Sequence, residues 1–206
     1  MPYDLKIRGW MPEHELKILE LWAAELPPQA TVVEVGSFYG RSAYCLAATA
    51  PTATVHCFDQ WVEEVELENE LFPLELRLKE GFPLPGEVNT LRNFLSNVCG
   101  LNNIRYQQVT SPEQIIWSPS AEVDLFFLDA MHTNPSDWEY LEFWLPKMRT
   151  GGYISGHDLQ VDRQWPAVHE NVERLEQLMG KKVETFHHLG SSLWRIKNEG
   201  RFHRSR

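Results

Sequence analysis

The chain has 206 residues, 43% of them hydrophobic, and carries a formal net charge of −10 at pH 7. This length and apolar content suit a single domain over residues 1–206 with a full hydrophobic core. The acidic residues concentrate between Glu63 and Glu80, so duplex nucleic acid would meet net repulsion and is excluded as an expected partner.

Cysteine usage and hydropathy indicate the compartment. Cys45, Cys57 and Cys99 are odd in number and widely spaced, which is typical of reduced packing thiols rather than of disulfides or a zinc site. The N-terminus lacks an apolar signal core, and no stretch approaches the roughly 18 apolar residues of a membrane span. We therefore expect a soluble, cytoplasmic protein with no membrane contact.

The first predicted element is a helix over about residues 12–26, which would cap the core. Pro12 suits a first helical turn, and Pro27 and Pro28 would stop the helix. Between these prolines the apolar residues recur at spacings of three and four: Leu16, Leu19, Trp22, Ala23 and Leu26.

From Thr31 onward, short apolar runs alternate with helix-length segments. Five runs rich in β-branched or aromatic residues are expected to be parallel strands: 31–35, 54–59, 103–109, 123–129 and 152–158. Two further short strands, around 181–188 and 191–196, are expected to pair as an antiparallel hairpin at the sheet edge. His187 and His188 would then face opposite sides of an edge strand and have no assigned role. The predicted fold class is α/β, doubly wound, with a mostly parallel seven-stranded sheet, helices on both faces and the last strand antiparallel.

The clearest helix follows the fourth strand. Asn134 is expected to cap it, with Pro135 at its first position. Its apolar stripe, which we interpret as core, runs until Gly151 and comprises Trp138, Leu141, Trp144, Leu145 and Met148.

A Glu-rich segment, residues 61–87, separates the second strand from a helix that begins near Val88. It is longer than ordinary connections, so we interpret it as a lid, with a solvated insertion or an oligomer contact as alternatives. A homo-oligomer is therefore compatible with the sequence. The last residues, about 198–206, are expected to form a mobile basic tail.

The stretch VVEVGSFYGRS ends the first strand in a glycine turn that could serve three kinds of site. A dinucleotide fingerprint needs G-x-G-x-x-G, whereas Gly36 and Gly40 have three residues between them, so NAD is disfavoured. A phosphate loop needs four residues between its glycines and then a lysine, but here Arg41 stands in that place. Nucleotide hydrolysis stays a third alternative because the run 123–129 ends in Asp, as the second motif of such enzymes does.

The remaining kind of site is one for a cofactor without phosphate groups. It is favoured by an acidic residue before the turn and by Asp59 at the end of the next strand. These residues resemble class I S-adenosylmethionine-dependent methyltransferases, whose cofactor carries no phosphate. Its methionine carboxylate could accept backbone N–H groups at the turn and helix N-terminus, and Asp59 could accept the ribose hydroxyls. The resemblance implies cofactor contacts from Glu34, Gly36, Ser37, Gly40, Ser42, Asp59, Gln60, Trp61, Ser111 and Asp129.

Three of these residues also have a purely structural interpretation. Gln60 and Trp61 would lie beside the adenine, or else serve as a cap and a partly buried aromatic residue. Ser111 would contact the adenine edge, or else cap a helix whose first position is Pro112.

The second half of the chain is more specific. The runs VDLFFLDAMHT and FWLPKMRTGGYISGHDL resemble the family 24 branch, relatives of sugar and macrolide O-methyltransferases and, more distantly, of catechol O-methyltransferase. The resemblance covers about Val32 to Leu159. It implies O-methylation of a small hydroxylated acceptor, with a sugar preferred over a catechol. A regulatory or scaffold module that binds the cofactor without turnover is the alternative.

Catalysis is expected at the carboxyl ends of the fourth and fifth strands. His132, three residues beyond Asp129, is the candidate base, because open α/β sheets bind ligands at this edge and imidazole titrates near neutral pH. In metal-dependent relatives, the residues corresponding to Asp129, His157 and Asp158 hold a divalent cation. Oxygen ligands would suit Mg²⁺, whereas His157 would suit a softer ion such as Mn²⁺, or no ion. In that last case Asp129 could bind the cofactor's amino group, and His157 could orient Asp158 or the substrate.

Overall fold

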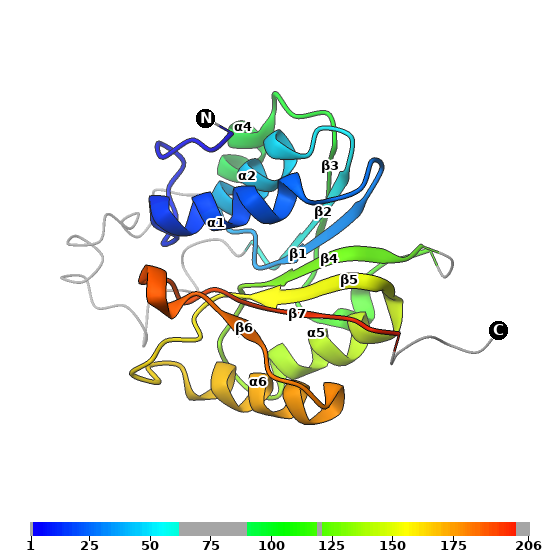
Figure 1. The fold of residues 1–206 in the computed structure, drawn as a ribbon. Coiled ribbons are helices and arrows are strands. Elements are labelled where there is room, and N and C mark those ends of the chain that lie inside the picture. Colours follow the sequence, from blue (N-terminus) through cyan, green and yellow to red (C-terminus); the bar gives the residue numbers. More distant parts are fainter. Residues whose placement is uncertain (1, 62–89, 119–120, 201–206) are drawn as a thin grey trace.

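The computed structural model describes residues 2–61, 90–118 and 121–200. Seven strands form one sheet in the order β3-β2-β1-β4-β5-β7-β6 (Figure 1). The first five are parallel, and β7 runs antiparallel to both β5 and β6, which confirms the predicted fold class. The strands are β1 (Thr31–Val35), β2 (Thr54–Asp59), β3 (Ile104–Gln108), β4 (Val123–Leu128), β5 (Met148–Gly156), β6 (Glu184–Thr185) and β7 (Trp194–Lys197).

Helices cover both faces of the sheet (Figure 1). One face carries α1 (Glu13–Ala24), α2 (Arg41–Thr49) and α4 (Thr90–Val98), whose apolar residues share one core cluster. The other carries α5 (Ser136–Trp144) and α6 (Pro166–Met179), which contribute to a second cluster. Three short 3₁₀ helices join these elements: η2 (Pro112–Gln114), η3 (Leu145–Lys147) and η4 (His187–Leu189).

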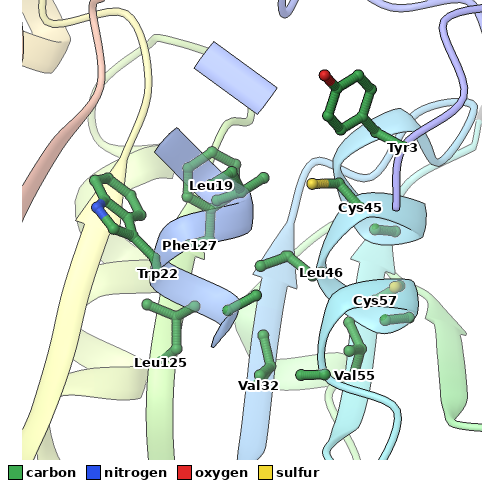
Figure 2. Packing of buried hydrophobic residues seen from close by; sticks show 14 of the residues in the cluster. Tyr3, Leu19, Trp22, Val32, Cys45, Leu46, Val55, Cys57, Leu125 and Phe127 are labelled. Atoms are coloured by element: carbon green, nitrogen blue, oxygen red, sulfur yellow. The ribbon is translucent and has the colours of Figure 1, made fainter. Parts of the chain in front are cut away.

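Alternation along the central strands divides the core into two layers. Val32, Leu125 and Phe127 point toward α1 and α2, where Figure 2 shows them beside Leu19 and Leu46. Their neighbours Val33, Val35, Phe126 and Leu128 point to the opposite face, because successive side chains of a strand alternate. All six residues of β4 are buried, as expected for a parallel strand covered on both sides.

Two predicted helix boundaries are wrong. Asn134 does not cap α5, which begins at Ser136. Its side-chain amide donates instead to Glu170 on α6, at 2.9 Å. The apolar stripe also leaves the helix early, because Pro146 has no N–H to continue the α-helical ladder. Residues 145–147 therefore form η3, and Met148 begins β5.

The predicted terminal hairpin is present but shorter than expected. Only Glu184 and Thr185 pair with β7, and His187 lies in η4 rather than on an edge strand. Its ring nitrogen Nε2 lies 2.6 Å from the Leu159 carbonyl oxygen, which ties this turn to the loop after β5. The prediction for His187 and His188 is therefore wrong.

Most of the predicted lid, residues 61–87, and the end of the predicted tail, residues 198–206, lie outside the described residues. The Glu-rich segment is described only at Trp61, and residues 201–206 are likewise outside. Asn198, where the predicted tail begins, is buried, and its side chain donates to the carbonyl oxygens of Met148 and Arg149 at 3.1 Å. Among the described helices, none has the length and apolar character needed to cross a membrane.

The register of the central strands defines the functional edge. Val35 pairs with both Phe58 and Leu128, and Leu128 pairs with Gly156. The residues that follow β1, β2, β4 and β5 therefore meet at one carboxyl edge. Strand order reverses between β1 and β4, which is where doubly wound sheets bind ligands.

Candidate functional site

Gly36 joins the turn after β1 to the end of β4. Its φ is +92°, and a Cβ built on it would lie 1.8 Å from the backbone oxygen of Asp129. Its amide also donates to the Phe58 carbonyl oxygen of β2 at 2.8 Å. Only glycine combines this backbone conformation with so close an approach, so the turn is held directly against the strand that carries Asp129.

Beyond the turn, the N-terminus of α2 offers unpaired donors. Gly40, with a φ of +88°, precedes the helix, and no side chain in the described residues caps it. The first amide groups of a helix have no partner within the helix, and they carry its positive partial charge. This end of α2 is therefore suited to a carboxylate.

The buried side chain of Glu34 stabilises the glycine turn through a hydrogen bond. Its side chain has no solvent exposure and accepts a hydrogen bond from the Ser37 hydroxyl, and Ser37 and Ser42 are themselves buried. Burial raises the pKa of Glu34 to about 7, since hydrogen bonds from the two serines offset only part of the desolvation. Glu34, Ser37 and Ser42 thus shape the turn rather than lie open at its surface.

Asp59 connects the turn to the loop after β2. One carboxylate oxygen accepts the Phe38 amide at 2.8 Å and the other accepts the Trp61 amide at 2.7 Å. A carboxylate offers about four acceptor sites, so capacity remains for a vicinal diol. Burial raises its pKa, and these backbone hydrogen bonds oppose the rise.

Gln60, Trp61 and Ser111, which each had a cofactor-binding and a structural interpretation, lie in different environments. Trp61 is buried against Phe94 with its indole N–H on the Phe38 carbonyl oxygen, so it belongs to the core, in line with its structural interpretation, and its contact with an adenine stays a prediction. Gln60 follows Asp59 at the carboxyl edge of the sheet, and its side-chain amide nitrogen lies 3.3 Å from the Met131 sulfur. Ser111 occupies the position before Pro112 at the start of the 3₁₀ helix η2, as the cap interpretation expects, but its hydroxyl hydrogen-bonds the Glu113 side chain and, within the described residues, makes no capping hydrogen bond to the backbone.

Arg41 does not face the turn that precedes it. Its guanidinium donates to the carbonyl oxygens of Ile7 at 2.5 Å, Met11 at 3.0 Å and Leu5 at 3.3 Å. The side chain at the position of a phosphate-loop lysine therefore anchors the N-terminal segment and does not supply the glycine turn with a cation for a phosphate.

Asp129, His132 and Asp158 converge at the ends of β4 and β5. One ligand atom from each lies within 4.8 Å of the others. His132 Nε2 lies 2.9 Å from Asp158 Oδ2 and 3.5 Å from Asp129 Oδ1, yet among the described residues this buried nitrogen has no partner in hydrogen-bond geometry. Three ligands aimed at a common point, one of them an orphaned nitrogen, fit a divalent cation.

Opposite charges dominate the protonation states of this cluster. Burial by itself would lower the pKa of His132, but Asp129 and Asp158 outweigh it and raise the pKa to about 10. Burial likewise favours protonated carboxyl groups, yet the two histidines hold the pKa of Asp129 and of Asp158 below the usual range. The metal-free cluster therefore pairs carboxylates with imidazolium.

His157, a predicted metal ligand, lies beside the three residues whose ligand atoms converge and is not one of them. Its Nε2 lies 2.7 Å from Glu15 Oε2, and its Nδ1 lies 3.0 Å from Asp158 Oδ2. Burial would lower the pKa of His157, but the surrounding carboxylates raise it well above the usual value. Both nitrogens of His157 thus lie against carboxylates, which places the ring to orient Asp158, and His132 contributes the nitrogen of the converging group.

Sequence reasoning missed three side chains of this site. Glu15 was detectable as a charged residue within the apolar face of the first helix. Asp137 accepts the Met131 amide at 3.2 Å and so holds the loop that carries His132. Trp165 stacks on the His132 ring with centroids 4.8 Å apart, and no local pattern identifies that contact.

A small cavity lies beside the cluster, between the ends of β4 and β7 and the helices α5 and α6. It has a volume of about 10 Å³ and is lined in part by His132, Asp137, His157 and Asn171. This volume corresponds to about one water molecule, so the cavity is not an acceptor site.

Comparison with protein families identifies one match. The model of methyltransferase family 24, described as a methyltransferase domain, matches residues 33–159, more than half of the chain. The match includes the glycine turn, Asp59 and the Asp129–Asp158 cluster. No curated protein sequence matches the chain.

Solved structures share the fold at low sequence identity. An S-adenosylmethionine-dependent O-methyltransferase from Thermotoga maritima aligns with a TM-score of 0.56 and 15% identity over 85% of this chain and 53% of that chain, so this chain spans about half of its length. The O-methyltransferase TomG from Streptomyces achromogenes, involved in tomaymycin synthesis and solved with S-adenosylmethionine, gives 0.59 and 15% over 92% and 82%. An O-methyltransferase from Bacillus cereus, in complex with S-adenosylhomocysteine, gives 0.56 and 17% over 92% and 83%.

We expect Gly36→Ala to destabilise the protein far more than Gly151→Ala. Both glycines have a φ near +90°, but a Cβ at Gly151 would meet nothing within 4 Å. Gly151→Ala should therefore cost only the left-handed backbone, about 1–2 kcal/mol. Gly36→Ala adds the clash with Asp129, about 1–3 kcal/mol more. Urea denaturation of both variants measures the difference, and equal losses would show that the contact between turn and strand is not tight.

We expect Glu34 to make stability fall as pH rises from about 4.5 to about 7. In this window the unfolded chain releases the Glu34 proton and the folded chain retains it, so folding becomes less favourable with rising pH. The loss from this group should be about 3 kcal/mol, at about 1.4 kcal/mol per pKa unit. Denaturation of wild type and Glu34→Gln across this range should give diverging profiles. The exposed Glu139→Gln is the control, and parallel profiles for Glu34→Gln would contradict the assignment.

Proposed function

The chain belongs to methyltransferase family 24, and from that premise we propose that it transfers the methyl group of S-adenosylmethionine to a hydroxyl oxygen of a small acceptor. One observation carries this proposal: an uncapped helix N-terminus, the partly buried carboxylate of Asp59 and a carboxylate–histidine cluster follow neighbouring strands at one sheet edge. These groups match, in order, a carboxylate, a ribose and a reacting centre.

The charge of the site favours this ligand over a nucleotide. S-adenosylmethionine carries two cationic groups, a sulfonium and an ammonium, whereas the charged groups of a nucleotide are its anionic phosphates. Asp59 and Asp129 border the turn, and Arg41 is engaged elsewhere. Like charges in a partly buried site repel strongly, so the nucleotide alternative is disfavoured.

Different residues around the turn would bind different parts of the cofactor. Backbone amides at the start of α2 hold the methionine carboxylate, and Asp59 accepts the ribose hydroxyls through its remaining acceptor sites. Gln60 and Ser111 stay proposed contacts for the adenine end. Asp129, adjacent to Gly36, lies between the cofactor turn and the His132 cluster and is placed to interact with both.

Asp129, His132 and Asp158 would hold a divalent cation, and two carboxylate oxygens with one imidazole nitrogen suit Mn²⁺ or Mg²⁺. Such an ion supplies Lewis acidity that lowers the pKa of a bound hydroxyl. Because the ligand form of His132 is neutral, ion and proton compete for the same nitrogen. His132 is thus a ligand in this proposal. The raised pKa opposes its role as a free base in the metal-free site.

Positioning supplies much of the rate in a methyl transfer, because the acceptor oxygen must approach the sulfonium methyl in line. S-adenosylmethionine, when bound, supplies that electrophilic methyl group. The protein's contribution is a rigid edge: Trp165 restrains the His132 ring, Asp137 holds its loop, and His157 holds Asp158. The proton of the acceptor hydroxyl would leave to solvent water, because the lowered pKa values of Asp129 and Asp158 make these carboxylates weak bases.

For the acceptor we propose a sugar or related polyol, in preference to a catechol. Support comes from family resemblance alone, because the carboxylates of the site, notably Asp129 and Asp158, could accept hydrogen bonds from the hydroxyl groups of sugars and catechols alike. A panel of sugars and catechols, assayed by S-adenosylhomocysteine release, separates the two classes. We further propose that the chain acts as one domain and in the cytoplasm, since Cys45, Cys57 and Cys99 are free thiols.

We expect wild type to bind S-adenosylhomocysteine, and Asp59→Asn to bind it about 10- to 100-fold more weakly, the scale of one lost charged hydrogen bond. Isothermal titration calorimetry measures both affinities. Asp162→Asn, an exposed substitution in the loop after β5, should retain wild-type affinity. Absence of binding to wild type would overturn the cofactor assignment, and equal affinity in Asp59→Asn would exclude Asp59 as a contact.

We expect Mn²⁺ to bind wild type with an affinity that rises with pH from about 6 upward and levels off only near the His132 pKa of about 10, because His132 must release its proton to coordinate the ion. His132→Ala should weaken binding at least about tenfold and flatten that pH dependence, while S-adenosylhomocysteine affinity stays unchanged. Mn²⁺ electron paramagnetic resonance measures the free ion directly. His14→Ala, on the surface of α1, is the control, and identical Mn²⁺ binding in His132→Ala would remove it from the ligand set.

A further inference from the structure

We propose that Glu15 is a positioning residue for the methyl-transfer site: its carboxylate fixes the ring of His157, which holds Asp158 in its orientation toward His132. Glu15 lies on the first turn of α1 and is separated from His157 by 142 residues in sequence. The inference rests on the proposed function, because the purpose of that orientation is to serve the Asp129–His132–Asp158 cluster.

The geometry of Glu15 permits one orientation. Its side chain is 3% exposed, and Oε2 lies 2.7 Å from His157 Nε2. Oε1 accepts the Ser192 amide at 2.7 Å, the Ser191 hydroxyl at 3.0 Å and the Ser192 hydroxyl at 3.2 Å. These contacts use the acceptor capacity of the carboxylate, so the segment before β7 clamps Glu15 while Glu15 restrains His157.

His157 transmits that restraint to the cluster. An imidazole ring has two nitrogens at fixed angles, so fixing Nε2 on Glu15 directs Nδ1. That atom lies 3.0 Å from Asp158 Oδ2 and 3.5 Å from Asp129 Oδ1. Asp158 Oδ2 is also the oxygen nearest to His132 Nε2. A continuous path of polar contacts therefore runs from α1 to the nitrogen of the candidate ligand set.

Asp158 needs such a restraint because its backbone provides little. Its φ is +60°, in the left-handed region that non-glycine residues rarely adopt, and it lies in the loop after β5. Strained residues persist where their surroundings hold them. The Glu15–His157 pair supplies one hold, and the Gln160 side chain supplies another through Asp158 Oδ1 at 3.2 Å.

The burial of the Glu15 carboxylate indicates that its contact with His157 does more than pack α1 against the sheet. Glu15 lies next to Leu16 on the face of α1 that packs on the sheet, where an apolar side chain would avoid the desolvation of a charge. The first turn of α1 lies at the same end of the sheet as the loop after β5 (Figure 1). Partners of this kind, behind metal-ligating side chains, typically change metal affinity 10- to 100-fold when removed.

The test compares Glu15→Gln with Glu20→Gln, the same substitution on the same helix away from His157. We expect Glu15→Gln to bind Mn²⁺ about 10- to 100-fold more weakly than wild type, with unchanged S-adenosylhomocysteine affinity. Glu20→Gln should match wild type. Adding His157→Gln to Glu15→Gln should cause little further loss, since both substitutions interrupt one path. A lower melting temperature with wild-type Mn²⁺ affinity would show that Glu15 only stabilises the fold, and would overturn the proposal.

A second measurement separates failure of this proposal from failure of the proposed function. In the metal-free protein, ¹⁵N spectra of the His132 ring report on its contact with Asp158. We expect Glu15→Gln to shift the His132 ring signals, and Glu20→Gln to leave them in place. If wild type binds neither Mn²⁺ nor S-adenosylhomocysteine, the proposed function fails, and this comparison still decides whether Glu15 positions the cluster. A change confined to His157, with His132 unaffected, would overturn the proposal.

Discussion

The close approach between Gly36 and the backbone of Asp129 is the constraint on which the rest of the site depends. It places the turn after β1 directly against the end of β4, at the point where strand order reverses. The donors at the start of α2 and the carboxylates of the acid–histidine cluster are thereby brought to one edge. A wider residue at position 36 would separate the part of the site suited to the cofactor from the part suited to methyl transfer.

Buried charge is the second organising feature. Glu15, Glu34, Asp59, Asp129, Asp137 and Asp158 all lie near the carboxyl edge, and their partners are of several kinds. Backbone amides hold Asp59, serine hydroxyls and retained protons stabilise Glu34, and two imidazolium rings balance Asp129 and Asp158. Unpaired, such groups would cost several kcal/mol each, so their partners determine which of them remain free to meet a ligand.

The site lies on loops whose geometry the sheet maintains. Phe38, Trp61, His132 and Asp158 all adopt positive φ, and all four follow strands at the same edge. Strain of this kind is maintained by the rigid, doubly covered strands beneath it and by contacts such as Trp61 on Phe38 and Trp165 on His132. The result is a site whose side chains are directed before any ligand arrives.

The sequence by itself determined the strands, the doubly wound class, the glycine turn and the placement of Asp59, Asp129 and Asp158 at strand ends. These features depend on local periodicity and on the rule that parallel strands present their carboxyl ends together. Only the tertiary structure decided that Trp61 is core, that Arg41 anchors the N-terminal segment, and that His157 supports Asp158 while His132 joins the candidate ligands. Each of these outcomes depends on a partner far away in the chain, such as Ile7 for Arg41 or Glu15 for His157. Local patterns carry no information about such pairs, because the energy that selects them arises only when distant segments are packed together.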